Sequence, residues 1–254
     1  MLVGLAAACA AFFLLPLIGL LVRTPWASAA GALSDESSIS ALRLSLLCSL
    51  ASTALALLFG VPLAWVLARL QFPGKSLLRG IATLPLVLPP VVGGVALLLA
   101  FGRRGLVGEP LAAAFGVGLP FTTLGAIVAE SFVAMPFLVI AVEAGLRSMD
   151  IRFEEAARTL GAGRWTVFRR VTVPLIAPSL VAGSVLAWSR ALGEFGATIT
   201  FAGNFPGTTQ TAPLAIYVDL DSQHPERAIV LSLLLVLVSL AVLVGLRDRF
   251  LGGA

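Results

Sequence analysis

Charged residues are scarce in this chain of 254 residues: only 12% are Asp, Glu, Lys or Arg, and 59% are hydrophobic. A soluble domain has about 25% charged and about 45–50% apolar residues. The low charge argues against a water-soluble globular fold, and the same composition excludes disordered, collagen-like and disulfide-rich chains. The net charge of +4 comes from arginines on short connections, which suits a membrane face better than a nucleic-acid surface.

Cysteine and histidine are also rare, with two cysteines and one histidine. Cys9 and Cys48 lie within apolar runs, where we expect small buried residues. His224 has no cysteine or histidine near it in the sequence, so we expect no metal site. The chain also lacks the G-x-x-x-x-G-K-[ST] loop that cradles nucleotide phosphates, so we expect it neither to hydrolyse ATP nor to bind a cofactor.

Long apolar runs are what the chain has instead. A helix of roughly 20 apolar residues spans a bilayer, and six runs are long enough: residues 2–22, 41–68, 77–101, 121–146, 174–201 and 228–246. The first run precedes Ala27-Ser28-Ala29, which is similar to a signal-peptide cleavage site. No Lys or Arg precedes that run, however, and it exceeds the about 7–15 residues of a signal core, so we interpret it as a retained span. The sequence predicts one all-α membrane domain over residues 1–254, with six transmembrane helices.

The distribution of Lys and Arg predicts the orientation of these spans. With the N-terminus in the cytoplasm, 11 of these residues are cytoplasmic and 5 are outside. The cytoplasmic set is Arg69, Lys75, Arg79, Arg147, Arg152, Arg158, Arg164, Arg169, Arg170, Arg247 and Arg249, and the outer set is Arg23, Arg43, Arg103, Arg104 and Arg227. Arg23 alone opposes this assignment, and the total outweighs it. Both termini are therefore predicted to be cytoplasmic.

Residues 148–173 form the longest predicted cytoplasmic connection. A first short helix there places apolar side chains at i, i+3, i+4 and i+7 on one face: Phe153, Ala156, Ala157 and Leu160. Gly161 is a plausible helix stop, and a second short helix places Trp165 and Phe168 on one face. Such a segment either docks into a groove on another protein or lies on the lipid interface.

The same segment contains Glu155-Ala156-Ala157, then Gly161, then Val171-Thr172-Val173-Pro174. This resembles the EAA loop of ABC importer permeases: Glu-Ala-Ala, three residues, Gly, nine residues and Ile-x-Leu-Pro, with two valines replacing Ile and Leu. In that family the loop forms coupling helices that dock into a cleft of the ATPase subunit. The resemblance implies that residues 148–173 are the coupling helices and that the ATPase meets Phe153, Glu155, Ala156, Ala157, Leu160, Gly161, Trp165 and Phe168.

Three further stretches narrow the resemblance, which covers roughly residues 40–246. Residues 84–94 and 190–197 resemble molybdate and sulfate permeases, and residues 202–217 look most like the molybdate branch. The resemblance implies a type I ABC importer permease that works as a homodimer in a bacterial or archaeal cell (inner) membrane. It also implies two ATPase subunits, which use ATP and Mg, and an extracytoplasmic oxyanion-binding protein. No nucleic acid is expected as a partner.

Molybdate, tungstate and sulfate are tetrahedral dianions, which need hydrogen-bond donors and positive potential. Arg190 and Glu194 stand at i and i+4 within an apolar run, where charges usually face the bundle interior. They are either a neutralising pair that holds helices together, or a place where Arg190 biases a pathway toward anions. Glu130 is expected to be protonated or paired away from such a path, and Glu143 to extend toward the cytoplasmic surface.

Two other groups of residues are candidates for a pathway or gate. The first interrupts the backbone ladder in the third run, either as a simple kink or as unwound backbone at a substrate site: Pro89, Pro90, Gly93 and Gly94. The second is a turn dense in hydrogen-bond donors, either an ordinary surface turn or an outer gate that contacts a binding protein: Asn204, Thr208, Thr209 and Gln210.

Other functions compete with molybdate import. The nearest is a permease for sulfate, thiosulfate or another oxyanion. A polytopic membrane enzyme is the alternative from a different class, and it would need a cluster such as paired Asp and His at one membrane face. A passive channel is disfavoured because the EAA-like loop would have no purpose without an ATPase.

Overall fold

The structure is a computed structural model that describes residues 1–222 and 225–250, which leaves His224 outside the described part. Every regular element in that part is a helix. Four stretches are long and apolar enough to span a membrane, and there are six if each of two bent pairs is one span. The predicted all-α membrane fold is confirmed, and all six apolar runs are helical.

Four of the runs are continuous helices. They are α1 (Leu2–Arg23), the stretch formed by α3 (Glu36–Leu55), the π-helical turn η1 (Ala56–Gly60) and α4 (Val61–Arg69), then α8 (Thr123–Ser148) and α15 (Pro225–Phe250). Between them lie the short helices α2 (Ala29–Ser34), α7 (Gly108–Phe115) and α14 (Ala212–Asp221).

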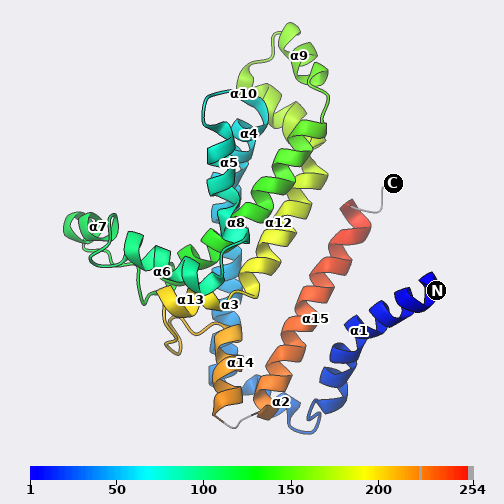
Figure 1. Cartoon of the computed structure of the whole chain (residues 1–254), viewed down its shortest axis with the longest axis vertical. Helices are drawn as coiled ribbons and strands as arrows, with labels where there is room; N and C mark the ends of the chain where they lie inside the picture. The colour runs from blue at the N-terminus through cyan, green and yellow to red at the C-terminus, as the bar shows by residue number, and fades with distance from the viewer. Residues whose placement is uncertain (223–224, 251–254) are drawn as a thin grey trace.

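Helix α8 is the centre of the bundle (Figure 1). It begins where the Thr122 hydroxyl accepts the Gly125 N–H at 3.1 Å, an N-cap that satisfies one of the free amide groups of the first turn. It packs against α3, α4 and α12 (Ala177–Leu192). The largest core joins α4, α8 and α12 through Leu67, Leu138, Val142, Leu146 and Ala187. Burial on several sides leaves α8 as the element against which the others are positioned.

The third run, residues 77–101, is not a straight span, and the interruption predicted at Pro89 and Pro90 is present. Helix α5 (Lys75–Thr83) continues into a 3₁₀ turn, η2 (Leu84–Leu86), and the chain then turns by 118° into α6 (Pro90–Phe101). Pro89 and Pro90 have no N–H to donate to the preceding carbonyls, and Pro90 at the first position of α6 starts a new helix. Pro89 and Pro90 therefore form a corner, and α6 and α7 extend sideways from the bundle (Figure 1).

The fifth run, predicted over residues 174–201, is also broken. It follows α10 (Arg164–Val167), the π turn η3 (Phe168–Thr172) and α11 (Val173–Leu175), and α12 begins after a bend of 73°. Helix α12 ends at Leu192, and a separate helix, α13 (Gly196–Phe201), follows. Helix α13 packs against α6, so the two broken segments meet each other beside α8.

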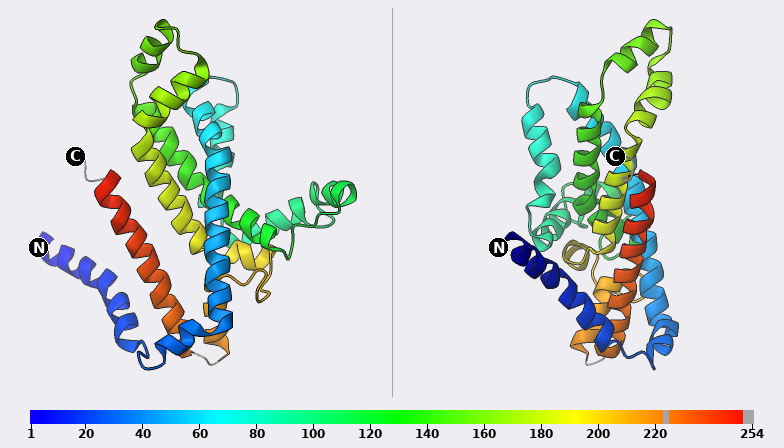
Figure 2. Two further views of the ribbon diagram at one scale, coloured as in Figure 1. Left: turned by 180° about the vertical axis from the view of Figure 1, so that it is seen from behind. Right: turned by 90° about the vertical axis from the view of Figure 1, so that its right-hand side faces the viewer.

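Helix α1 lies apart from the bundle and leans away from it (Figure 1, Figure 2). None of its residues is buried, and the expectation of a buried Cys9 is wrong, although Cys48 on α3 is buried. At the foot of α1, Arg227 of α15 binds Asp35 at 2.8 Å and Asp219 of α14 at 2.9 Å. The Ser37 hydroxyl donates to Asp35, and with the nearby Arg227 charge it lowers the pKa of that carboxyl. This charged cluster holds the ends of three helices together.

Candidate functional site

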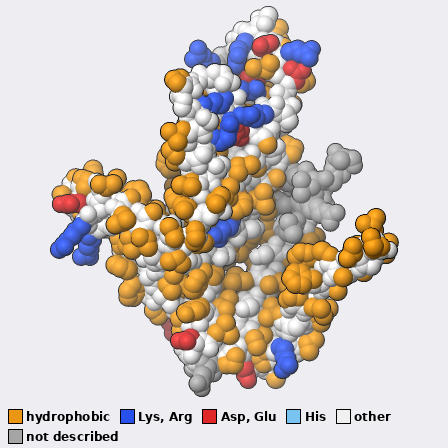
Figure 3. All heavy atoms as spheres, in the orientation of Figure 1, with side chains coloured by type: hydrophobic (Ala, Val, Ile, Leu, Met, Phe, Trp, Pro, Cys, Tyr) orange, Lys and Arg blue, Asp and Glu red, His pale blue; other side chains and the backbone are white. Residues whose placement is uncertain are grey.

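The predicted coupling segment lies at one end of the molecule and forms helix α9 (Arg152–Thr159) followed by α10 (Figure 1). Most Lys and Arg side chains visible in Figure 3 gather at this end, and hydrophobic side chains predominate over the rest of that face, with a few charged groups on the sideways projection and at the opposite end. The large apolar side chains of the segment point away from the bundle: Phe153 is 56% exposed, Leu160 88% and Trp165 71%. Glu155 and Ala156 are also exposed, and Ala157 is half-buried. These side chains form a surface that this chain does not cover.

Gly161 ends α9 with a left-handed residue, φ +86°. The Gly161 N–H donates to the Arg158 carbonyl at 2.9 Å, and the Ala162 N–H donates to the Ala157 carbonyl at 3.0 Å. These two bonds are the Schellman arrangement, which satisfies the last helical carbonyls only when the residue after the cap is left-handed. The predicted helix stop at Gly161 is confirmed, and it directs the chain into α10, where the rings of Trp165 and Phe168 stack 5.7 Å apart.

Glu154, which the sequence did not single out, ties this surface to the bundle. Its side chain is only 4% exposed. The carboxylate accepts the Thr172 hydroxyl of η3 at 2.7 Å, and Arg69 at the end of α4 lies 3.5 Å away. Arg158, one turn along α9, adds a contact at 3.4 Å. Only the i,i+4 spacing of Glu154 and Arg158 was visible in the sequence, because the other partners come from different helices.

Arg190 and Glu194 lie where α12 gives way to α13. Arg190 Nη2 is 2.6 Å from Glu194 Oε2, so the predicted pair is confirmed. Glu194 Oε1 also accepts the Ala197 N–H at 2.8 Å, which caps the start of α13. The Glu194 side chain is 1% exposed, whereas that of Arg190 is 27% exposed. The buried Glu194 carboxylate therefore both pairs with Arg190 and caps α13, and part of the Arg190 guanidinium remains accessible.

The glycines of α6 serve close packing. A Cβ on Gly94 would lie 2.5 Å from the Thr200 Cβ of α13, and a Cβ on Gly93 would lie 3.1 Å from the Phe132 ring of α8. From the other side, a Cβ on Gly196 would lie 2.8 Å from the Pro90 Cβ. The distances at Gly94 and Gly196 are shorter than real Cβ atoms show, so α6 and α13 pack this closely only because these two positions lack side chains.

Several polar groups of the donor-rich turn after α13 already form hydrogen bonds, either within the turn or to α8. The Thr209 hydroxyl is buried and accepts the Phe205 N–H at 2.9 Å, and the Thr208 carbonyl accepts the Thr123 hydroxyl of α8 at 2.8 Å. Gln210 is half-buried. Asn204 is also half-buried, and its Oδ1 is buried with no partner in the described part of the chain. These hydrogen bonds hold the turn in one conformation, in which the Thr208 side chain is exposed.

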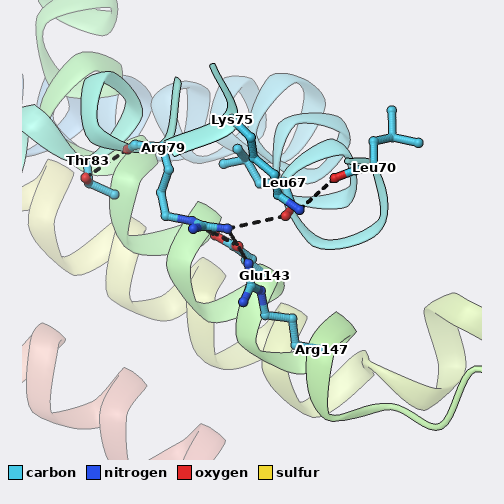
Figure 4. Close-up of polar contacts among 7 residues, drawn as sticks. All are labelled: Leu67, Leu70, Lys75, Arg79, Thr83, Glu143 and Arg147. Atoms are coloured by element: carbon cyan, nitrogen blue, oxygen red, sulfur yellow. Dashed lines mark hydrogen bonds and ion pairs between the residues drawn. The ribbon is translucent and has the colours of Figure 1, made fainter. Parts of the chain in front are cut away.

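The two other acidic residues of α8 are both buried. Glu130 lies within 3.3 Å of the Ser52 hydroxyl of α3. Glu143 does not extend to the surface as expected, because Arg79 of α5 holds it at 2.6 Å and Arg147 holds it at 2.7 Å (Figure 4). The structure thus places the predicted residues in two groups: the coupling segment at one end, and the pathway candidates around the junction of α6, α12 and α13, well away from α9 (Figure 1).

The fold is shared with a known class of membrane protein. It matches the crystal structure of a bacterial ABC transporter involved in the import of the acidic polysaccharide alginate, with a TM-score of 0.75 and 21% identity, over 100% of this chain and 94% of that one. The architecture is therefore that of an ABC importer permease. The chain belongs to the family of binding-protein-dependent transport system inner membrane components, whose model matches residues 60–251.

Curated relatives are much closer in sequence. The molybdenum transport system permease protein ModB of Mycobacterium bovis is 48% identical over 94% of this chain and 89% of its own length. The ModB protein of Escherichia coli is 46% identical over 78% of this chain and 90% of its own length. The sulfate transport system permease protein CysT of Escherichia coli is more distant, at 38% identity over 87% of this chain and 81% of its own length.

Proposed function

We propose that this chain is the membrane-spanning permease subunit of an ATP-driven importer that carries molybdate, and equally tungstate, into the cytoplasm. The observation that carries the proposal is the 48% identity to a molybdenum permease along nearly the whole chain, against 38% to a sulfate permease. Sulfate or thiosulfate import is the second candidate. In this function the chain is not an enzyme, and it moves an oxyanion without changing it.

Reconstitution in liposomes tests the substrate. The permease is combined with an ATPase subunit and an oxyanion-binding protein, and ATP hydrolysis and oxyanion uptake are measured with molybdate, tungstate or sulfate. We expect molybdate and tungstate to stimulate both activities to a similar extent, because the two dianions have nearly equal size. Stimulation by sulfate as strong as that by molybdate would favour the second candidate, and no stimulation by any oxyanion would overturn the proposal.

The exposed coupling segment supports the proposed ATPase partner. Three large apolar side chains that are more than half exposed would be costly in water, about 25 cal/mol for each Å² of apolar surface, and docking would remove that cost. The segment lies at the end of the molecule where most Lys and Arg gather, which suits the cytoplasmic side. Each permease copy would hold one ATPase subunit, and that subunit would bind ATP and Mg. Both termini are then cytoplasmic.

A second copy of this chain is the proposed partner within the membrane. Helix α1 buries none of its residues against its own bundle. A pathway enclosed between two copies would need no channel within a single chain. The opposite end of the molecule, with α2 and α14, would face the oxyanion-binding protein. The bacterial alginate ABC transporter, which shares this fold, has been crystallised in complex with an alginate pentasaccharide-bound periplasmic protein.

The pathway is proposed to pass the junction of α6, α12 and α13. Arg190, partly exposed there, would supply positive potential, and its pairing with Glu194 would keep the anion from being held too tightly. The bend at Pro89 and Pro90 would shape the pathway at the same depth as Arg190. The turn that contains Asn204, Thr208, Thr209 and Gln210 would form the outer gate, with the unpartnered Asn204 oxygen as its least satisfied polar group.

Gly161→Val is expected to uncouple this importer. A left-handed conformation costs a residue with a Cβ roughly 1–2 kcal/mol, and a β-branched residue tolerates it least. A Cβ at position 161 meets no atom within 4 Å, so the cost arises from the backbone alone and the bundle should fold normally. We expect molybdate uptake to fall by about tenfold, the factor that corresponds to ~1.4 kcal/mol, while the melting temperature of the permease falls by only a few degrees.

Gly161→Asn is the matched control, because Asn adopts the left-handed conformation readily. It should retain most of the uptake. Normal uptake by Gly161→Val, with the ATPase bound, would show that the turn between α9 and α10 has no part in coupling.

A further inference from the structure

A groove opens beside the start of α5, between the α4–α5 connection and the last turn of α8. It is lined by Gln71, Phe72, Gly74, Lys75, Ser76, Arg79 and Arg147. The lining contains an ammonium group, two guanidinium groups, an amide and a hydroxyl, all of which donate hydrogen bonds, and it contains no carboxylate. A surface with this composition is complementary to an anion.

The charges around the groove do not cancel. Glu143 lies between the two arginines, which approach its carboxylate from two sides (Figure 4). Arg79 Nε and Nη2 both contact the carboxylate, at 3.2 Å and 2.6 Å, and Arg147 Nη2 lies 2.7 Å from the same oxygen. One carboxylate thus faces two guanidinium groups, and Lys75 adds a third positive charge while its ammonium group donates to the Leu70 carbonyl at 2.6 Å. Two positive charges remain without a partner in this cluster.

The positive groups are accessible. The side chain of Arg147 is 51% exposed and that of Arg79 is 35% exposed, whereas that of Glu143 is only 9% exposed. An anion in the groove would therefore meet the guanidinium groups before the carboxylate. The nine-residue helix α5 begins at Lys75, so the positive end of its dipole also points into the groove.

Helix α5 and the start of η2 also present an apolar stripe, on the face of the helix opposite to Lys75 and Arg79. Leu77, Ile81 and Leu84 follow one another at i, i+4 and i+7, and they are 68%, 58% and 49% exposed. The stripe is therefore not part of the groove, and an anionic group bound there would be held by the cations and the other hydrogen-bond donors, as the phosphate of an anionic lipid is at a basic membrane face. A free tetrahedral dianion would satisfy the same cations.

We propose that the Lys75–Arg79–Arg147 groove is a binding site for a tetrahedral oxyanion group, supplied either by the phosphate of an anionic lipid headgroup or by a free oxyanion. The site is separate from the Arg190 region. The inference uses the proposed orientation only to place the groove at a membrane face. It does not depend on which solute the importer carries.

Binding to the full chain, purified without its partners, tests this site. Retention of phosphatidylglycerol is measured by native mass spectrometry from mixed phosphatidylcholine and phosphatidylglycerol micelles. Binding of free molybdate and of free phosphate is measured by equilibrium dialysis. The double variant Lys75→Gln/Arg147→Gln removes two cations but leaves Arg79 on Glu143, so no buried carboxylate loses its only partner. In whichever assay detects binding by the native chain, lipid retention or dialysis, we expect the affinity of this double variant to be lower by at least about tenfold.

Two further variants keep the result interpretable. Arg103→Gln/Arg104→Gln removes the same charge from exposed positions on the α6–α7 connection and should bind as the native chain does. Ser76→Glu adds a carboxylate to the groove at an exposed position and should lose affinity without disturbing the Glu143 contacts. Loss in the lipid arm alone identifies a headgroup site, and loss in the dialysis arm alone identifies a free-oxyanion site. Equal binding by all variants in both arms overturns the proposal, and a failure of molybdate transport does not affect it.

Discussion

Arg190→Met should be far more damaging than Glu194→Gln, although each removes one member of the same ion pair. Glu194 is 1% exposed, so loss of Arg190 leaves a buried carboxylate with no cation beside it. Breaking a buried pair in this way costs about 3–5 kcal/mol. Glu194→Gln leaves the cation instead, and Arg190 is accessible enough to find water or an anion. A glutamine can also still accept the Ala197 N–H, so the cap on α13 persists.

The double change Arg190→Met/Glu194→Gln should recover most of the stability, because neither charge is then stranded. Thermal unfolding of the purified permease measures this, and uptake of molybdate measures function in the same variants. We expect the double variant to be stable but slow, since the anion loses its positive potential. Uptake at the native rate would assign the pair a structural role only. Additive losses from the two single changes would show that the residues do not interact.

Glu154→Ala should both destabilise the permease and uncouple it. The substitution removes the charge that faces Arg69 and the acceptor for the Thr172 hydroxyl, both in buried surroundings. We expect a loss of about 3 kcal/mol or more in the free energy of unfolding. Helix α9 would lose its connection to α4 and η3. ATP hydrolysis should then continue with little response to loaded binding protein, which a stimulation assay measures.

Glu155→Gln is a matched control for stability, because Glu155 is the next residue on the same helix but is exposed. A surface substitution of this kind usually changes stability by less than about 0.5 kcal/mol. A Glu154 variant as stable as the Glu155 variant would show that the buried contacts of α9 do not hold the segment in place.

The hydropathy of the sequence predicted all six apolar segments, but it did not predict the bends within them. Apolar length reports that a segment avoids water, and α5 with α6 satisfies that requirement equally well whether straight or bent by 118°. The prolines at positions 89 and 90 predicted a break in the backbone ladder, yet the angle depends on α13, which packs against α6 from a distant part of the chain. The end of α12 at Leu192 was missed for a related reason, because Glu194 caps a separate helix there.

The coupling segment could be predicted in more detail than the pathway. Its helix stop depends on one residue, Gly161, and on hydrogen bonds to residues within five positions, so local sequence contains the information. The position of Glu154 in the core of that region could not be read in the same way, because Arg69 lies 85 residues away in the sequence. The groove beside α5 combines residues from two helices and a connection, and no sequence period links them.

The short length of α6 has a consequence for how the chain is made. Its 12 residues extend about 18 Å, less than the about 30 Å of a hydrocarbon core, so α6 cannot enter the bilayer as an independent span. The surface that its Gly94 needs belongs to α13, which leaves the ribosome only after α8, α9 and α12 have been synthesised. The third segment can therefore reach its final packing only after the fifth has been made, and a ribosome stalled after α8 would hold a chain whose α6 still lacks its packing partner.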